Sequence, residues 1–490
     1  MGTVIAVLNK KGINAVEPAI AMLRKLKLAD SESYGIASPT VITMERSLDA
    51  LQSQEIGGID SPVLIGSAFS EILPRDRPQP LKLKDETLVF DGRIYPGNSE
   101  ISDVEIVAKR LQQNGKRACE EFVKQTNGDF VFVMAEAERL VAGRDVMGVR
   151  PLYYGENRDF AALASERKAL WEIGIENPDS FPPGCVAVVD RTGFKFTAAK
   201  KLGYPQPKRL GMRDASEKLQ TLLQRSVIER TSDLKKCAVA FSGGLDSSLI
   251  ASLAKNMGIN VHLIHVSLEG QSETEHAKRV AEKLQLPIES YSFSEADVQR
   301  VLPNVLQLIE MPDPVQTSIG IPVYWAAEKA AEMNFHVLLA GQGADELFGG
   351  YRRYVDDYLR YGSKKVQETM FNDIVQMYKT NFERDSKICN FHDVELRLPF
   401  VTYQIAKFAV DLPLVLKVKP ASYTLRKLVL RRAARNMGLP QLIVERPKKA
   451  IQYTTGVNKT LMKFARKERL PINEFLQRAF RSVFRGMIHE

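Results

Sequence analysis

The sequence has few of the residues that build disulfide frameworks and metal clusters. Its 490 residues include only four cysteines and six histidines. Cys119, Cys185, Cys237 and Cys389 are too scattered for the ligand spacing of a zinc site. So few cysteines also fit a reducing compartment, and we expect a cytoplasmic protein.

Long hydrophobic runs are absent as well. No apolar stretch approaches the roughly 20 residues that a membrane-spanning helix requires. The first apolar stretch is broken at Asn9–Gly12, which argues against a signal peptide. The Met-Gly start would suit myristoylation, but position 6 is Ala6 instead of serine or threonine. We therefore expect no membrane partner.

Acidic residues are outnumbered, and the formal net charge is +9. The densest basic segments are Leu425–Asn436, which has the pattern of an amphipathic helix with a solvated face, Arg446–Ala450 and Arg478–Arg485. We do not expect these segments to bind nucleic acid. Part of the charge would suit ATP and pyrophosphate.

A hydrophobic strand that runs into Ser242-Gly243-Gly244-Leu245-Asp246-Ser247-Ser248 is the strongest functional signal. Two glycines let backbone N–H groups turn toward an anion, and the following helix adds its own unpaired N–H groups. Asp246 beside a phosphate is explained if Mg²⁺ lies between them. The loop lacks the Gly-Lys-Ser/Thr ending of a Walker motif. The alternative is a tight glycine turn without a ligand.

A second glycine-rich loop carries acids in the same way. The apolar segment His336–Ala340 leads into Gly341-Gln342-Gly343-Ala344-Asp345-Glu346. Ligands of parallel α/β sheets bind beyond the carboxyl ends of the strands, so this loop and the first can meet over one nucleotide. We expect Asp246 and Asp345 to share its metal; an ordinary turn with a solvated acidic patch is the alternative.

These two loops, with Val394–Phe400 and Glu445–Ala450, resemble the glutamine-dependent asparagine synthetases, a family of ATP pyrophosphatases. The resemblance implies ATP and Mg²⁺ as cofactors and release of pyrophosphate. It also implies a lysine that neutralises phosphate charge, which is Lys448 with Lys449 as competitor, unless both belong to a solvated basic surface. The positions that it places at the nucleotide are Ala240, Ser242, Gly243, Gly244, Asp246, Ser247, Val266, Ala340 and Gly341.

The two halves of the sequence differ in their pattern. Before the boundary at Gly203–Asp214, the sequence shows short strands with an alternating pattern and clear helices around residues 16–28 and 103–125. This pattern predicts antiparallel sheets. Gly143–Gly155 and Ser102–Leu111 resemble the family's amino-terminal-nucleophile glutaminase domain, an αββα sandwich. Beyond the boundary a βαβ rhythm predicts a parallel α/β sheet, with no strand after Phe348. We expect domains at residues 1–203 and 213–490.

The glutaminase residues of the family are largely missing. Its chemistry uses a cysteine directly after the initiator methionine, and this chain reads Met1-Gly2-Thr3; Thr3 could serve only if both preceding residues were removed. No arginine for the glutamine carboxylate occurs in Leu28–Gly35, and Asp91-Gly92-Arg93 replaces Asn-Gly-Glu. Only Asp103 remains as a holder of the glutamine amine. We expect the fold without glutamine hydrolysis.

The acceptor side also departs from the family. Gln342 occupies the position of a glutamate that the family uses in acyl-adenylate formation and amine handling; a glutamine can orient a nucleophile but cannot take a proton. In Asp313–Trp325, Ser318 stands near the family's aspartate-binding arginine, which leaves Gln316, Thr317 and Ser318 as polar candidates. Without a guanidinium fork, aspartate is in doubt as the acceptor.

The leading hypothesis is an ATP-dependent ligase that adenylates a small carboxylate and transfers it to free ammonia. One alternative is intramolecular amide formation of the β-lactam synthetase kind, although those enzymes carry a tyrosine where this chain has Gln342. The other is a non-catalytic nucleotide-binding regulator. The sequence leaves a homodimer open.

Overall fold

The computed structural model describes residues 2–26, 33–53, 58–97, 100–112, 115–207, 209–419, 425–448 and 454–485. The chain forms two compact units. The first contains residues 1–201, the segment Asn390–Glu395 and the chain from Phe484 onward. The second contains Leu202–Cys389 and Leu396–Val483. Within the described residues, no helix is long and apolar enough to cross a membrane.

Two antiparallel sheets form the centre of the first unit. The strand order is β11-β9-β10-β1-β4-β2-β3 in one and β13-β12-β8-β7-β6-β5 in the other. The strands are β1 (Gly2–Asn9), β2 (Ser33–Ala37), β3 (Ile42–Glu45), β4 (Val63–Phe69), β5 (Leu81–Lys82), β6 (Thr87–Ile94), β7 (Gly128–Glu136), β8 (Arg139–Arg144), β9 (Tyr153–Glu156), β10 (Phe160–Ala164), β11 (Asp179–Ser180), β12 (Cys185–Asp190) and β13 (Gly193–Ala198).

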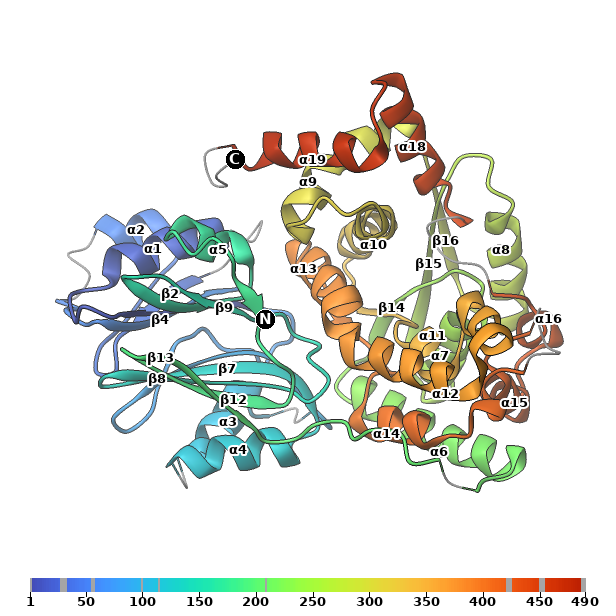
Figure 1. The fold of residues 1–490 in the computed structure, drawn as a ribbon, viewed down its shortest axis with the longest axis horizontal. Coiled ribbons are helices and arrows are strands. Elements are labelled where there is room, and N and C mark those ends of the chain that lie inside the picture. Colours follow the sequence, from blue (N-terminus) through green and yellow to red (C-terminus); the bar gives the residue numbers. More distant parts are fainter. Residues whose placement is uncertain are drawn as a thin grey trace. The chain divides into compact units, whose positions relative to one another are not determined.

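Helices cover the outer face of each of these sheets (Figure 1). Alternate residues of β1 face opposite ways: Ile5 and Val7 pack with α1 (Val16–Lys25), α2 (Leu48–Ser53) and α5 (Arg167–Glu172), while Val4 and Ala6 pack against the other sheet. On the far side, α3 (Asp103–Leu111) and α4 (Gly115–Gln125) complete the αββα sandwich. The helix expected over residues 103–125 is thus two helices.

The second unit is built on a five-stranded sheet of order β16-β15-β14-β17-β18. Its strands are β14 (Lys236–Ala240), β15 (Asn260–Leu268), β16 (Ile288–Phe293), β17 (Val337–Leu339) and β18 (Glu395–Arg397). The pairs β14·β15, β14·β17 and β15·β16 are parallel. The expectation of no strand after Phe348 is wrong, because the three buried residues of β18 pair at the sheet edge; so short a strand leaves almost no periodic signal.

Helices surround this sheet (Figure 1). They are α6 (Met212–Thr231), α7 (Leu245–Asn256), α8 (Glu273–Leu284), α9 (Glu295–Ile309), α10 (Pro314–Glu332), α11 (Ala344–Phe348), α12 (Arg352–Met377), α13 (Glu383–Phe391), α14 (Tyr403–Asp411), α15 (Leu428–Asn436), α16 (Gln441–Val444), α18 (Val457–Lys467) and α19 (Ile472–Val483). A π-helical turn, η1 (Tyr378–Phe382), leads into α13, and a 3₁₀ turn, η2 (Leu414–Leu416), follows α14.

Candidate active site

The first glycine-rich loop joins β14 to α7, at the carboxyl end of a central strand. Gly243 has φ +65°, and a Cβ there would come within 3.1 Å of His276, so this position requires glycine on both grounds. Gly244 is the N-cap of α7 and has no side chain to bond the helix's first N–H groups. Those N–H groups remain available to an anion.

Two serine hydroxyls fix the shape of this loop. The Oγ atoms of Ser242 and Ser247 are 3.3 Å apart, and the Gly244 amide donates to Ser242 Oγ at 3.3 Å. The Ser242 amide in turn donates to Ser247 Oγ at 3.3 Å. The hydroxyls that the sequence predicts as phosphate ligands are therefore held side by side within one turn of backbone.

The second loop approaches the first closely. It joins β17, the parallel neighbour of β14, to the short helix α11. A Cβ on Gly341 would lie 2.8 Å from Asp246 Cβ and 3.2 Å from the Ser247 amide nitrogen. Only a residue without a side chain allows this approach. The meeting of the two loops that the sequence predicts is thus a direct contact in the structure.

Two lysines join the acidic residues of these loops into one cluster. Lys427 Nζ lies 2.6 Å from Asp246 Oδ2 and 2.7 Å from Asp345 Oδ1. Lys448 Nζ lies 2.7 Å from Asp345 Oδ2. Burial alone would raise the pKa of Asp345, but the two lysines lower it below its usual value. Burial alone would lower the pKa of Lys448, but Asp345 and Asp246 raise it. Both aspartates keep 16 % of the side chain exposed, so the cluster is reachable from solvent.

The two aspartates suit a magnesium ion. A single ammonium reaches one oxygen of each, so one cation can bind both. Asp246 Oδ1 is buried and has no hydrogen-bond partner among the described residues, which leaves it open to a metal. No group of three or more His, Cys, Asp or Glu in the described chain could hold a metal alone. Mg²⁺ commonly takes one or two carboxylates and completes its shell with phosphate and water oxygens.

The remaining nucleotide positions lie around these loops. Ala240 is the last residue of β14 and Ala340 directly follows β17; both are partly buried. Val266, in β15, is 7 % exposed and therefore offers little surface as the structure stands. Lys449, the competitor of Lys448, lies outside the described residues, as do residues 28–32 of the segment without a glutamine-binding arginine.

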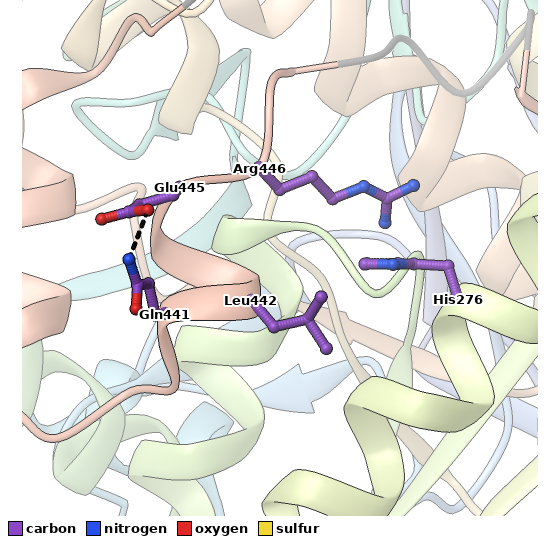
Figure 2. Close-up of a pocket in the computed structure, with 5 residues that line it drawn as sticks. All are labelled: His276, Gln441, Leu442, Glu445 and Arg446. Atoms are coloured by element: carbon purple, nitrogen blue, oxygen red, sulfur yellow. Dashed lines mark hydrogen bonds between the residues drawn. The ribbon is translucent and has the colours of Figure 1, made fainter.

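A hollow of about 450 Å³ lies behind the first loop, lined by His276, Gln441, Leu442, Glu445 and Arg446 (Figure 2). Arg446 and His276 extend toward each other across it. Both reach the carbonyl oxygen of Gly243, at 3.3 Å from Arg446 Nη1 and 3.1 Å from His276 Nε2. These contacts bind a backbone carbonyl of the loop and leave the N–H groups at the start of α7 unused. We interpret the residues around this hollow as structural support for the first loop.

The expected acceptor segment is the first turn of α10. Thr317 and Ser318 are almost fully buried, and their hydroxyls donate to the carbonyls of Asp313 and Val315 respectively. Gln316 is partly exposed and accepts from Arg384 Nη1 at 2.7 Å. Of the three candidates, only Gln316 reaches beyond its own helix.

Sequence reasoning missed three charged residues at this site: Lys427, Arg384 and Asp385. Gln342 Nε2 donates to Asp385 Oδ2 at 2.8 Å, and Arg384 pairs with Asp385. Lys427 lies in the basic segment that reads as a solvated helix face, yet only 2 % of its side chain is exposed. Its φ of +60° just before α15 directs it away from that helix's pattern, which periodicity does not reveal.

In the first unit, the expected glutamine-binding positions are occupied by internal ion pairs. Arg93 donates through Nη2 to Asp76 Oδ2 at 2.8 Å and through Nη1 to Asp103 Oδ2 at 3.1 Å. Its Nε donates to Glu395 Oε2 at 2.6 Å. All four side chains are buried, and although burial opposes it, these carboxylates raise the pKa of Arg93.

Gly2, which stands where the family has its nucleophilic cysteine, has no room for a side chain. Gly2 lies in β1, where a Cβ would be 2.8 Å from the Ala68 carbonyl oxygen. The Gly2 amide donates to Asp91 Oδ1 at 3.3 Å. Burial raises the pKa of Asp91, and its second oxygen, Oδ2, has no partner in the described chain.

Comparison with known proteins agrees with this geometry. The family model "Asparagine synthase" matches residues 218–363 and 360–482, and the model "Glutamine amidotransferase domain" matches residues 68–172. The "Putative asparagine synthetase 1 (glutamine-hydrolyzing)" of Methanocaldococcus jannaschii is 29 % identical over 99 % of both chains.

"Asparagine synthetase 1 (glutamine-hydrolyzing)" of Arabidopsis thaliana is 29 % identical over 78 % of this chain and 69 % of its own. The resemblance and the fold class expected from the sequence are confirmed, as are an ATP-dependent carbon–nitrogen ligase and its ATP and Mg²⁺ cofactors. Because the first family model matches more than half of the chain, this protein belongs to the asparagine synthase family.

Proposed function

We propose that this protein adenylates a small carboxylic acid with Mg-ATP, releases pyrophosphate, and converts the acyl-adenylate to an amide with free ammonia. The observation that carries the first half is the Asp246–Lys427–Asp345–Lys448 cluster at the contact of the two loops. Cleavage between the α and β phosphates requires a phosphate cradle, a metal and a positive charge that can follow the leaving group. The groups for all three are available at this cluster.

The proposed roles follow from the groups that each loop offers. Ser242, Gly243, Gly244 and Ser247 would hold the β and γ phosphates through N–H and hydroxyl groups. Asp246 and Asp345 would hold Mg²⁺, which when bound neutralises phosphate charge. Lys448, partly exposed, can leave Asp345 for the leaving pyrophosphate.

In the adenylation step, a carboxylate oxygen of the acid forms a bond to the α-phosphorus. The bond from that phosphorus to the pyrophosphate oxygen breaks, and pyrophosphate leaves with the electron pair. The ammonium of Lys448 stabilises this charge as it develops.

Free ammonia is proposed as the nitrogen source because of the first unit. A Cβ at position 2 would collide with backbone, so even a cysteine there would need the strand to shift. Asp103, the expected holder of the glutamine amine, is committed to Arg93. Neither group that glutamine hydrolysis requires is available.

The adenylation proposal is tested by exchange of labelled pyrophosphate into ATP, with aspartate first and then other amino acids and small carboxylic acids. We expect exchange that depends on one acid and is lost in Asp246→Asn. The matched control is Glu217→Gln, in an exposed ion pair of α6. Absence of exchange with every acid, together with an Asp246→Asn variant that binds ATP like the wild type, would refute adenylation.

The nitrogen source is tested by measuring AMP and amide formation with ammonium chloride and with glutamine. Wild type and Gly2→Cys should both use ammonia and not glutamine. If glutamine supports the wild type as well as ammonia does, the account of the first unit is wrong. Activity with glutamine in Gly2→Cys alone would show that the ion pairs of Arg93 do not prevent glutamine hydrolysis.

A further inference from the structure

Gln342 is held in one orientation by a carboxylate from a distant helix. Its Nε2 donates to Asp385 Oδ2 at 2.8 Å, across 43 residues of sequence. An ionised carboxylate can only accept hydrogen bonds, so the NH₂ end of the amide must face Asp385. The other end, Oε1, has no partner within the described chain, and the side chain is partly exposed.

Asp385 is itself rigidly placed. Arg384 Nε donates to Asp385 Oδ1 at 2.7 Å and Arg384 Nη2 to Oδ2 at 3.1 Å, a two-bond fork on a carboxylate that is 5 % exposed. The remaining guanidinium nitrogen, Nη1, donates to Gln316 and to the Thr380 carbonyl. Thr380 lies in the π-helical turn η1, a feature often found at functional sites.

Gln342 belongs to the second glycine-rich loop, which carries Asp345 of the cluster. Gln342 directly follows Gly341, the residue in contact with Asp246. We propose that Gln342 Oε1 accepts a hydrogen bond from the incoming amine, and that Asp385, clamped by Arg384, is the positioning residue that keeps this oxygen turned toward it. This inference rests on the proposed function, because it concerns the second step of that reaction.

The chemistry of an amide oxygen sets the form of the nucleophile. A neutral oxygen binds an N–H of neutral ammonia and does not remove its proton. The nitrogen lone pair then forms the C–N bond to the acyl carbon of the acyl-adenylate. The C–O bond to the phosphate breaks, AMP leaves with the electron pair, and the proton lost by nitrogen passes to water.

Asp385 also accounts for the glutamine at position 342. A glutamate there would place a second carboxylate about 3 Å from Asp385, where like charges disfavour ionisation of both. A carboxylate at 385 therefore needs a donor at 342. The reverse pair, a glutamate at 342 with an asparagine at 385, would satisfy the same contact and again leave an oxygen free.

The test compares Gln342→Glu, Asp385→Asn and the double variant, each in the full chain. Ammonium chloride and the acid found by pyrophosphate exchange are the substrates, and aspartate is the acid probe if none is found. In Asp385→Asn the new side-chain amide faces Gln342 with its NH₂ group, so Gln342 turns and presents its own NH₂ to the amine. We expect the KM for ammonia to rise about tenfold in each single variant, the effect of one lost hydrogen bond. The double variant should recover to within a few-fold of wild type.

Pyrophosphate exchange separates this inference from the proposed function. Exchange should stay within about twofold of wild type in Asp385→Asn, because only a hydrogen bond of the second step is changed there. Loss of exchange in wild type would refute adenylation itself. Exchange that persists while the KM for ammonia stays unchanged in both single variants, or a double variant with the two losses simply added, would overturn the role of Asp385.

Discussion

The two units hold their charged residues in opposite ways. In the first, Arg93 is surrounded by Asp76, Asp103 and Glu395, and none of these side chains is more than 7 % exposed. In the second, the Asp246–Lys427–Asp345–Lys448 cluster keeps open edges, with Lys448 26 % exposed. Buried charges that are fully paired stabilise one structure, whereas paired charges with solvent access can exchange partners for a ligand. We expect the first set to contribute to stability and the second to exchange partners for the proposed nucleotide.

Breaking the paired set in the first unit should give the largest effect. Arg93→Met removes the cation that pairs with three buried carboxylates, of which Asp103 keeps a longer contact with Arg75 at 3.6 Å, and should cost about 3–5 kcal/mol of stability. Denaturant unfolding of the full chain measures this, and ammonia-dependent activity per folded molecule should stay at the wild-type level. Lys463→Met, which removes an exposed pair with Glu295, is the matched control and should cost less than about 1 kcal/mol. A transition unchanged by Arg93→Met would contradict the comparison.

In the second unit we expect a substitution to lower activity and to leave stability nearly unchanged. Asp246→Asn should lower pyrophosphate exchange by about 10²–10³-fold, comparable to loss of one preorganised charge-stabilising group. Its thermal unfolding without nucleotide should change little, because Asp246 is only partly buried. If the variant loses stability and keeps its exchange rate, the cluster is structural and the contrast between the units fails.

Substitutions of the two lysines of the cluster should have different effects on activity and stability. Lys448 is partly exposed and Lys427 only 2 % exposed, so Lys448→Met should reduce the rate of exchange by about 10²-fold with normal folding. Lys427→Met leaves Asp246 and part of Asp345 without a cation in the interior, so it should lower the unfolding midpoint as well. Equal behaviour of the two variants in both assays would show that exposure does not distinguish their roles.

The smallest effect concerns Lys417, a buried lysine ten residues before Lys427 but outside the cluster. Burial, opposed by Asp411, lowers the pKa of Lys417 to about 7. The unfolded chain therefore binds more protons between about pH 7 and the ordinary lysine pKa of about 10.4, and stability should rise with pH across that window. Lys417→Met should remove this rise in melting temperature between about pH 7 and pH 9. An unchanged pH profile would refute the burial effect.

Local sequence was sufficient for much of the fold. Strand and helix periods place β14, β15, β16 and β17 and their helices, and β14 and β17 also end in glycine-rich loops, which are a local signal. The short strand β18 and the division of residues 103–125 into α3 and α4 were not predicted, since three residues carry no period and a helix break needs no proline.

The same distinction holds for the site. The loops carry Asp246 and Asp345 as local motifs, but Lys427 and Asp385 come from segments whose own pattern is that of ordinary helices. Their position depends on tertiary packing across 181 and 43 residues, which no local pattern encodes. Arg93 is an intermediate case: the charge reversal was visible in the sequence, but the three carboxylates that accept it were not.

The first unit is discontinuous in sequence, and this has a consequence for synthesis. Glu395, which pairs with Arg93, is made 302 residues after it, and Phe484, which meets Trp171 edge to face with ring centroids 5.3 Å apart, is made later still. Domains generally fold in order as they leave the ribosome. Here the earliest-made sandwich receives Glu395 and Phe484 only after both glycine-rich loops have been made, so completion of the first unit reports that translation has passed those loops.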